Sequence, residues 1–376
     1  MLRTMPEGVD LHPLEIKTDG ATEYDIVSLG EVMLRLDPGD RPIAGARVFE
    51  AWEGGGEYNV ARAASAVFGL RSAVVTALVD NAVGRLIVRL IGEGGVDTRF
   101  VTWLPFDGIG KKVRNPLNFT ERGFGVRAAR GVSDRASSAA SQNVLEAVGW
   151  DDVFFKYGTR WFHTGGIFTA LSEESAQAAM NAIARARDSG AVVSYDLNYR
   201  PSLWQDRGGR QAARELNAKL ATMVDVLVGN EEDYGDCLGI EVPRVKDVDR
   251  VEEREGFAEI LLEARRQYPG VKVTLMTLRK VLSASRNDWS AIGIAGDALY
   301  KGRMFHGLEI YDRIGGGDGF ISAFAAAMLE GKDFSRAIDE GIAHGALVMT
   351  TPGDVSMATK DDVERLAGGS APRVIR

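Results

Sequence analysis

The sequence predicts an α/β protein with a mostly parallel central sheet covered by helices, and a small accessory β-sheet. Short apolar runs rich in β-branched residues alternate along the chain with helical patterns, as they do in βαβ units. These runs are continuously apolar, which is typical of strands buried on both faces. Two segments, residues 37–53 and 99–134, break the rhythm with short β-like pieces between Gly, Pro and Asn.

The main domain is predicted to span residues 24–370, between an N-terminal extension (1–23) that is unstructured or loosely docked and a short tail (371–376). The strand-like runs are, in order, 25–36, 72–78, 160–165, 191–197, 225–230, 271–278 and 307–312. The helical patterns between and after them are 57–70, 82–95, 137–148, 173–190, 212–224, 257–269 and 320–331.

The two irregular segments, 37–53 and 99–134, are predicted to pair with each other. A long structureless loop is uncommon inside a compact domain, so each segment should contribute strands. We expect the resulting sheet to sit at one end of the main sheet.

Composition places the chain among soluble globular proteins. It has 376 residues, of which 45% are hydrophobic and 26% charged. A single cysteine, Cys237, excludes an internal disulfide and a cysteine-based metal cluster, which favours a reducing, cytoplasmic setting. No run of about 18 apolar residues is present, and the start lacks the order of a signal peptide. We therefore expect no membrane partner.

Charge is unevenly distributed. The formal net charge of −8 argues against general nucleic-acid binding. The segment from Arg99 to Arg135 nevertheless contains eight basic and three acidic residues, a net charge of +5. Two interpretations are open: a solvated basic loop, or a funnel that attracts a small anion.

A glycine-rich loop carries the strongest chemical signal. Gly315, Gly316 and Gly317 follow a strand-like run and precede an apolar helix that begins near Asp318. Without side chains, the loop can bring its N–H groups against an anion at the positive end of the helix. Asp318 would then accept a proton from a hydroxyl as a general base. The alternative is a tight turn in which Asp318 only caps the helix.

A second glycine loop, Gly54 to Gly56, precedes a helix of small residues that carries Asn59. An asparagine amide offers both a donor and an acceptor to a sugar hydroxyl, and glycine lets a substrate lie on the backbone. Small residues at these positions would equally allow close packing of the helix on the sheet.

Two further strand ends carry polar residues. Arg200 follows Asp196 and Asn198 just past a buried strand, where it could bind a carboxylate or phosphate in a bidentate manner, or be solvated in a polar turn. Residues 230–233, Asn-Glu-Glu-Asp, could hold Mg²⁺ through water, or simply favour the helix dipole. The four histidines show no metal-ligand spacing.

Common nucleotide motifs do not fit. No G-x-x-x-x-G-K-[ST] run occurs, and neither glycine loop completes G-x-G-x-x-G, because Phe320 or Asn59 occupies the last position. A nicotinamide dehydrogenase is therefore disfavoured.

As a set, these motifs resemble the ribokinase-like (PfkB) carbohydrate kinases over residues 24–370. "DRIGGGDGF" and "GGGEYNVARAASAVFG" are similar to the two signatures of that family, in the family's order and separation. The resemblance implies a three-layer sandwich with a small β lid that commonly forms a dimer interface. It also implies ATP and Mg²⁺ as cofactors and allows a monovalent cation.

Residue roles follow from the resemblance. Asp318 would be the catalytic base, with the glycines as its anion hole. The sugar would contact Gly55, Gly56 and Asn59, and its acid group Arg200 and Arg135. The nucleotide would border Asn230, Thr277, Leu278, Arg279, Gly315, Gly317 and His344, while Glu232 and Asp233 would hold Mg²⁺ through water.

Within that family the chain most resembles the 2-dehydro-3-deoxygluconate kinases, through "SYDLNYRPSLW", "GNEED", "SASRNDWSA" and "SDRASSAAS". This implies transfer of the ATP γ-phosphoryl group to the 6-hydroxyl of a keto-deoxy sugar acid. A kinase of a neutral ketose such as fructose, and a catalytically silent sugar-binding regulator, remain alternatives. Two departures stand out: Asp233 replaces the family's glutamate, and Gly319 stands where alanine or serine is usual.

Overall fold

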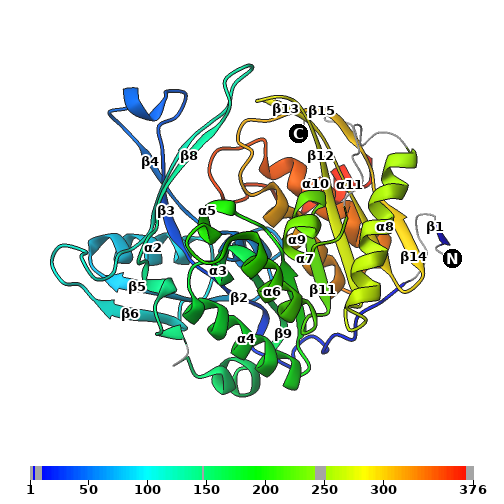
Figure 1. Ribbon diagram of the computed structural model, residues 1–376, viewed down its shortest axis with the longest axis horizontal. Helices are drawn as coiled ribbons and strands as arrows, with labels where there is room; N and C mark the ends of the chain where they lie inside the picture. The colour runs from blue at the N-terminus through cyan, green and yellow to red at the C-terminus, as the bar shows by residue number, and fades with distance from the viewer. Residues whose placement is uncertain (1–2, 5–10, 146–147, 242–250, 370–376) are drawn as a thin grey trace.

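A computed structural model describes residues 3–4, 11–145, 148–241 and 251–369 (Figure 1). The main sheet has the strand order β1-β14-β13-β12-β11-β10-β9-β2-β5-β6, with β15 paired to β13. Its parallel part consists of β2 (Tyr24–Leu29), β5 (Ser72–Asp80), β6 (Val101–Pro105), β9 (Thr159–Gly165), β10 (Val192–Asp196), β11 (Val226–Asn230) and β12 (Val273–Ser283). An antiparallel edge follows, made of β13 (Arg286–Ala295), β14 (Ala298–Lys301) and β15 (Phe305–Glu309), with β1 (Arg3–Thr4) beside β14.

Helices cover both faces of this sheet. They are α1 (Gly56–Ala66), α2 (Ala82–Glu93), α3 (Gly166–Thr169), α4 (Glu173–Asp188), α5 (Pro201–Trp204), α6 (Gly209–Ala221), α7 (Glu231–Leu238), α8 (Val251–Gln267), α9 (Gly316–Leu329), α10 (Phe334–Val348) and α11 (Lys360–Ala367). Successive strand residues enter two different cores: Val27 packs with α4, α6 and α8, whereas Ile26 packs with α9 and α10. The three-layer α/β prediction is therefore confirmed.

A second sheet, β4-β3-β7-β8, stands out from the body at the upper left of Figure 1. It consists of β3 (Met33–Asp37), β4 (Glu50–Gly54), β7 (Leu117–Glu121) and β8 (Arg130–Asp134). Both irregular segments contribute strands to this sheet, β4 from 37–53 and β7 and β8 from 99–134, but β3 separates β4 from β7. Most of β3 lies in the strand-like run 25–36, so the two segments share a sheet without the direct pairing that was predicted. Strand β6, inside the predicted segment 99–134, extends the main sheet instead.

Other details also depart from the sequence prediction. Among the described residues, the segment 137–148 contains a 3-10 turn, Ala139–Ser141, and no α-helix, where a helix was expected. Part of the N-terminal extension is held against the body: Leu14 is buried, and the N–H of Phe334 donates a 3.0 Å hydrogen bond to the carbonyl of Leu11. In the part of the chain that the structure describes, none of the helices has the length and apolar character needed to cross a bilayer.

Candidate active site

The carboxyl ends of five parallel strands meet along one edge of the main sheet. Strands β9, β10, β11 and β12 and the neighbouring β2 run in the same direction, so the loops that follow them are adjacent. Strand β3 follows β2 directly and brings the second sheet to this edge. Ligands of open α/β sheets bind at such an edge. The loop that carries Arg200 follows β10, and Asn230 ends β11.

Asp318 and Asn59 are in direct contact at this edge. The Asn59 side-chain amide donates a 2.7 Å hydrogen bond to Oδ2 of Asp318. Asp318 lies in the first turn of α9, and the N-cap position belongs to Gly315, so the alternative in which Asp318 only caps the helix does not hold. The two glycine loops therefore join into one site.

Electrostatics favour Asp318 as a proton acceptor near neutral pH. Burial raises the pKa of Asp318 to about 6; the carboxylate of Asp354 contributes to this rise, and the Asn59 hydrogen bond and Arg200 oppose it. A base whose pKa lies close to the working pH is both deprotonated and basic enough to take a hydroxyl proton.

The three glycines of the loop before α9 have different surroundings. Gly315 has φ +82°, a left-handed conformation, and a Cβ there would lie 2.7 Å from the carbonyl oxygen of Asp354. A Cβ on Gly316 would press against Met349, 3.1 Å away. Gly317 has no atom within 4 Å of the equivalent point, so it faces open space. The first-turn N–H groups of α9 are thus available to an anion.

In the first glycine loop, Gly54 and Gly55 are surrounded by protein atoms that leave no room for a side chain. A Cβ on Gly55 would lie 2.1 Å from the carbonyl oxygen of Glu31, and one on Gly54 2.2 Å from Oδ2 of Asp354. Gly56 differs, because its nearest neighbours are Oδ1 of Asp318, at 3.6 Å, and the amide of Asn198, at 3.8 Å. Gly56 is consequently the glycine of this loop that lies against the carboxylate of Asp318.

The loop after β10 adds polar groups to the site. Asn198 has φ +32°, unusual for a residue with a side chain, and its amide donates to Oδ2 of Asp196 at 3.2 Å. Burial holds the pKa of Asp196 well above its ordinary value, helped by the carboxylates of Asp233 and Asp318. Arg200 is exposed, and its guanidinium donates to the neighbouring Tyr199 carbonyl. Its charge opposes the rise in the pKa of Asp318 and of Asp196, so it lies near both carboxyl groups.

The Asn230–Asp233 turn holds this loop in place. Asn230 and Asp233 form a capping box at the start of α7. The oxygens of Asp233 accept backbone hydrogen bonds from Tyr199 (2.9 Å) and Asn230 (3.0 Å), and the side chain is buried. Glu232, the other predicted magnesium partner, is exposed. Among the described residues, no group of three or more His, Cys, Asp or Glu side chains could hold a metal ion directly.

Residues predicted to border the nucleotide follow strand β12. Thr277 pairs with Asn230 across adjacent parallel strands, which places both at the same edge. Arg279 is exposed, and its charge lowers the pKa of Arg313, for which burial is the larger cause. The two guanidinium groups therefore lie near each other. Leu278 points into the core and has no exposed surface.

His344 does not face the site, which corrects its assignment to the nucleotide. The ring is fully buried, and burial lowers its pKa to about 4. Nδ1 lies 2.8 Å from the carbonyl oxygen of Gly319, and Nε2 lies 2.8 Å from the hydroxyl of Ser356. His344 thus supports the first turn of α9 from behind.

The glycine at position 319 is explained by the packing of α9 against α10. A Cβ at this position would lie 2.9 Å from Cγ2 of Val348 and 3.3 Å from Cα of Gly345, both on α10. Glycine at both positions lets α9 and α10 approach closely beneath the glycine loop. This departure from the family pattern is a matter of helix packing.

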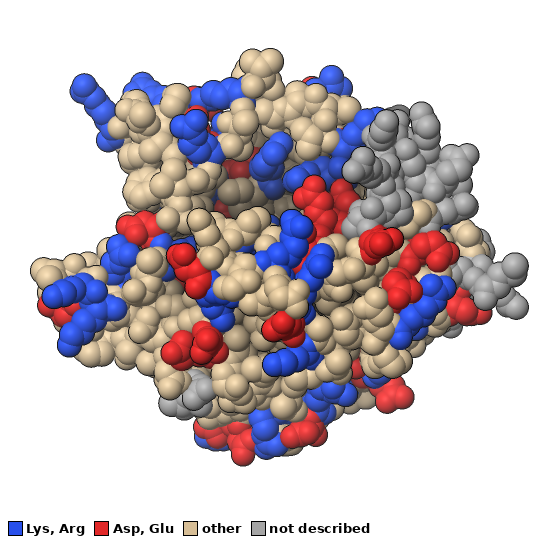
Figure 2. Space-filling view, in the orientation of Figure 1, with Lys and Arg blue, Asp and Glu red and all other residues tan. Residues whose placement is uncertain are grey.

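The basic segment 99–135 is not a free cationic funnel. Five of its six arginines pair with acidic groups, several of them outside the segment: Arg99 with Glu23, Arg114 with Asp134, Arg122 with Asp37, Arg127 with Glu121, and Arg135 with Glu31. Basic and acidic side chains are interspersed on the face shown in Figure 2. The net charge of +5 was counted within the segment and did not include acidic partners that are distant in sequence.

Arg135, predicted to hold the acid group of the sugar, is one of these paired residues. Its guanidinium lies 2.6 Å from Oε2 of Glu31, and the side chain is only 14% exposed. Ser138 donates to the other oxygen of Glu31. The exposed Arg200 is therefore the freer of the two cations.

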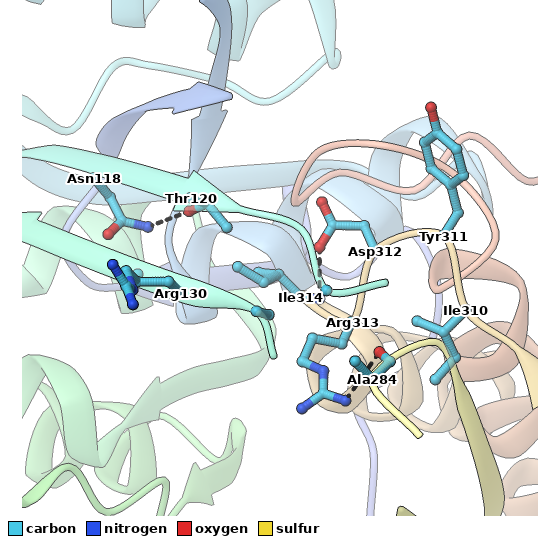
Figure 3. A pocket seen from close by; sticks show the side chains of 12 residues that line it. Asn118, Thr120, Arg130, Ala284, Ile310, Tyr311, Asp312, Arg313 and Ile314 are labelled. Carbon is cyan, nitrogen blue, oxygen red and sulfur yellow. Dashed lines mark hydrogen bonds between the residues drawn. The ribbon is translucent and has the colours of Figure 1, made fainter. Parts of the chain in front are cut away.

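A cavity of about 250 Å³ lies between the second sheet and the loop that leads into α9 (Figure 3). Asn118, Thr120 and Arg130 lie on the strands of one wall, and Tyr311 and Arg313 lie on the opposite wall. The lining reaches Ile314, the residue before the glycine loop, and does not include Asp318.

Several functional candidates were missed by sequence reasoning. Arg35, Asp37, Arg122, Asp312 and Asp354 form a buried ionic cluster between the second sheet and the glycine loops. These residues come from four separate parts of the chain, and none carries a local pattern that would connect it with the others. Glu57, directly after Gly56, was given no role from the sequence, yet it is a buried carboxyl beside this loop.

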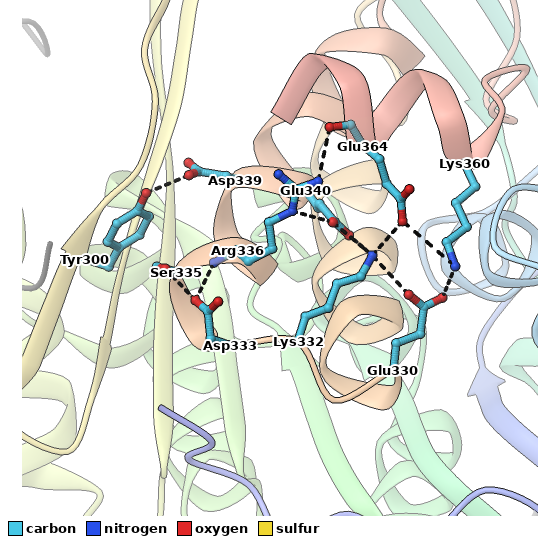
Figure 4. Close-up of polar contacts among 10 residues, drawn as sticks. All are labelled: Tyr300, Glu330, Lys332, Asp333, Ser335, Arg336, Asp339, Glu340, Lys360 and Glu364. Atoms are coloured by element: carbon cyan, nitrogen blue, oxygen red, sulfur yellow. Dashed lines mark hydrogen bonds and ion pairs between the residues drawn. The ribbon is translucent and has the colours of Figure 1, made fainter. Parts of the chain in front are cut away.

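A second ionic network stabilises the helices behind α9 (Figure 4). Lys332 contacts Glu330, Glu340 and Glu364 at 2.9–3.0 Å, and Arg336 donates to the buried Glu340 at 2.7 Å. These bonds join the end of α9 to α10 and α11. The glycine helix is thereby anchored at the end opposite the site.

Comparisons with known proteins agree with this geometry. A model described as pfkB family carbohydrate kinase matches residues 24–361. The 2-dehydro-3-deoxygalactonokinase of Haloferax volcanii is 30% identical over 350 residues, which cover 92% of this chain and 98% of the relative.

Solved structures are similar as well. The 2-dehydro-3-deoxygluconokinase of Thermotoga maritima has a TM-score of 0.83 and 33% identity, covering 92% of this chain and all of that one. A ribokinase II of E. coli, solved in complex with ATP and Mg²⁺, has a TM-score of 0.71 at 17% identity, over 92% of this chain and 99% of that one. At that identity the second likeness concerns the fold alone.

Proposed function

The chain belongs to the pfkB family of carbohydrate kinases, and we propose that it phosphorylates the 6-hydroxyl of 2-dehydro-3-deoxy-D-gluconate with ATP. The observation that carries this proposal is the contact of Asp318 with Asn59 beside the first turn of α9. The names of the Haloferax and Thermotoga relatives, both keto-deoxy sugar-acid kinases, support the substrate class.

The reaction assigns a role to each group at the site. The sugar hydroxyl oxygen attacks the γ-phosphorus in line, and the bond from that phosphorus to the bridging oxygen of ADP breaks. Asp318 accepts the hydroxyl proton. The N–H groups of Gly316, Gly317 and Asp318 donate to the phosphoryl oxygens, because phosphoryl transfer depends on positioning and charge stabilisation.

The magnesium and nucleotide partners are proposed on chemical grounds. Glu231 and Glu232 begin α7, and burial raises the pKa of Glu231, with Glu232 adding to the shift. A group of neighbouring carboxylates can hold a cation through water. Glu232 is exposed, whereas Asp233 already accepts hydrogen bonds from backbone N–H groups. When bound with ATP, Mg²⁺ neutralises phosphate charge. We also assign Arg279 and Arg313 to the phosphates, because two neighbouring guanidinium groups attract an anion. A requirement for a monovalent cation stays a prediction, tested by assays in sodium and potassium salts.

Specificity for an acid is assigned chiefly to Arg200. A guanidinium beside the reacting groups binds a carboxylate with charge-assisted hydrogen bonds and gives no such advantage to a neutral sugar. A kinase of a neutral ketose such as fructose is the alternative on the same fold.

Measuring ADP release with 2-dehydro-3-deoxygluconate, 2-dehydro-3-deoxygalactonate and fructose tests the proposal. We expect kcat/KM for one of the acids to exceed that for fructose by at least about tenfold, which corresponds to one charged hydrogen bond. A higher kcat/KM for fructose would select the alternative. Absence of ADP release with every sugar would point to a sugar-binding regulator.

We further propose that the second sheet forms a dimer interface. Exposed apolar side chains gather on its loops and on β8: Val48, Phe124, Val126 and Val132. A second copy of this chain would cover them. Sedimentation of the wild type and of Phe124→Glu tests this, and a monomeric wild type would refute it.

We also propose a cytoplasmic location, supported by the single, buried, unpaired Cys237.

A further inference from the structure

A buried ionic cluster connects the second sheet to both glycine loops. Arg35, on β3, has no exposed side-chain surface and contacts three carboxylates. Its guanidinium lies 3.0 Å from Asp37 and 2.5 Å from Asp354, and it also donates to Asp312. Because these acids belong to different segments, a single side chain fixes their relative positions.

Two of these acids touch the loops that build the site. The carboxylate of Asp312 accepts the N–H of Ile314 at 3.2 Å, which sets the turn leading into Gly315. Asp354 lies against both loops: its side chain crowds Gly54, and its carbonyl oxygen crowds Gly315. The sugar loop and the phosphate loop are consequently held by the same cluster.

The second sheet enters the cluster through Arg122. This side chain is 8% exposed, lies 3.0 Å from Asp37 and 3.9 Å from Asp312, and stacks over the ring of Tyr311 at 4.6 Å. It follows β7 directly, so any shift of that part of the second sheet acts on Asp312.

Stability alone is a poor reason for this arrangement. Burying two cations and three anions costs desolvation that their mutual attraction often only offsets. Apolar side chains would fill the same space at less cost. A cluster that spans the second sheet and both loops is better explained by the positions it enforces.

We propose that Arg122 is a positioning residue for phosphoryl transfer, which acts through Asp37, Arg35 and Asp312 to couple the second sheet to the backbone of the glycine loop. The proposal rests on the kinase function proposed above. Arg122 acts at a distance from the substrate, so its loss changes the placement of the anion-binding N–H groups and leaves the side chains that bind the sugar in place.

The test compares Arg122→Gln with a matched control, Arg127→Gln. Arg127 lies in the same segment and pairs with Glu121 at 3.7 Å, with no contact to Asp312. We expect Arg122→Gln to lower kcat about tenfold to a hundredfold with the sugar KM changed less than about threefold, because misplacement by about 1 Å has effects of that size. Arg127→Gln should stay within about twofold of wild type, because the ion pair is long, at 3.7 Å, and the Arg127 side chain is 38% exposed.

Amide hydrogen exchange of the ligand-free proteins supplies a readout besides activity. In Arg122→Gln, peptides covering residues 54–58 and 312–318 should exchange faster than in wild type, and in Arg127→Gln they should not. Tyr311→Leu, at a half-exposed position, is a milder variant if Arg122→Gln fails to fold. It should give the same exchange pattern and a smaller loss of kcat, about threefold to tenfold, because it removes only the stacking contact.

The outcomes separate this inference from the proposed function. A wild type without kinase activity would refute the proposed function, and the exchange data would still decide the coupling. An active wild type, with Arg122→Gln and Tyr311→Leu matching Arg127→Gln in kcat and in exchange, would overturn the inference.

Discussion

Asn59 and Asp318 are separated by 259 residues in sequence and are joined by a 2.7 Å hydrogen bond. Each belongs to the first turns of a helix that begins at a glycine loop. The bond orients the carboxylate that is proposed to take the substrate proton, and it also stabilises the charged form of that carboxylate.

Removing the Asn59 amide should move the pH profile of the reaction. The base works when deprotonated, so activity should fall as the pH drops below about 6, the pKa to which burial raises Asp318. The amide lowers that pKa, and Asn59→Ala should therefore shift the acidic limb of kcat to higher pH. Asn181→Ala, on α4, is the control. Coincident limbs for Asn59→Ala and wild type, measured from pH 5 to pH 9, would show that Asp318 is not the titrating base.

Substitution of two glycines of α9 should affect catalysis at one position and stability at the other. Gly317→Ala adds a methyl group where no atom lies within 4 Å, so stability should change by less than about 0.5 kcal/mol while kcat falls sharply. Gly319→Ala pushes on Val348 and Gly345 and should cost about 1–3 kcal/mol of unfolding free energy. Urea denaturation and steady-state kinetics of both variants provide the measurements. An unstable Gly317→Ala beside a stable Gly319→Ala would contradict the assigned roles.

Glu57 should make stability depend on pH. Burial raises its pKa from 4.5 to about 7, while the N–H of Phe168, donating at 3.2 Å, lowers it. Between these two values the folded protein keeps a proton that the unfolded chain has lost, so stability declines as the pH rises from 4.5 to 7.

Glu57→Gln removes this titration. The free energy of unfolding of the variant, relative to wild type, should rise by on the order of 2–3 kcal/mol between pH 4.5 and pH 7 and stay level above it. Urea denaturation at several pH values checks this, with the exposed Glu259→Gln as control. Parallel curves for Glu57→Gln and wild type would mean that Glu57 is already ionised across this range.

The two arginines assigned to the sugar acid should behave differently. Arg200 is exposed, so Arg200→Gln should raise the KM of the sugar acid about tenfold to a hundredfold with little change in stability. Arg135→Gln leaves the buried Glu31 without its cation, and should cost about 3 kcal/mol or more of unfolding free energy. Kinetics and thermal unfolding distinguish the two. A larger KM effect at Arg135 would return the acid group to that residue.

Local patterns in the sequence were sufficient for the framework. The apolar runs that became β2, β9, β10 and β11 have both faces buried, and the glycines before α1 and α9 stand at helix starts as predicted. These features depend on periodicity and backbone conformation, which neighbouring residues determine.

The features that could not be predicted from the sequence depend on tertiary contacts. The charge of the 99–135 segment looked unbalanced because Glu23, Glu31 and Asp37 pair with it from a distance. His344 lay next to a motif that was expected to border the nucleotide, but its ring turns inward to Gly319. Distances between residues far apart in sequence cannot be read from composition or spacing.

The Asp318→Asn variant, assayed with 2-dehydro-3-deoxygluconate and ATP, tests the central claim most directly. Asparagine keeps the size of the side chain and cannot accept the hydroxyl proton, so kcat should fall by on the order of 10²–10⁴-fold. Sugar and ATP affinities, measured by calorimetry on the same variant, should stay within about threefold of wild type, because the lost interaction belongs to the chemical step. A variant that binds both substrates and keeps a kcat near that of wild type would contradict the assignment of Asp318 as the base.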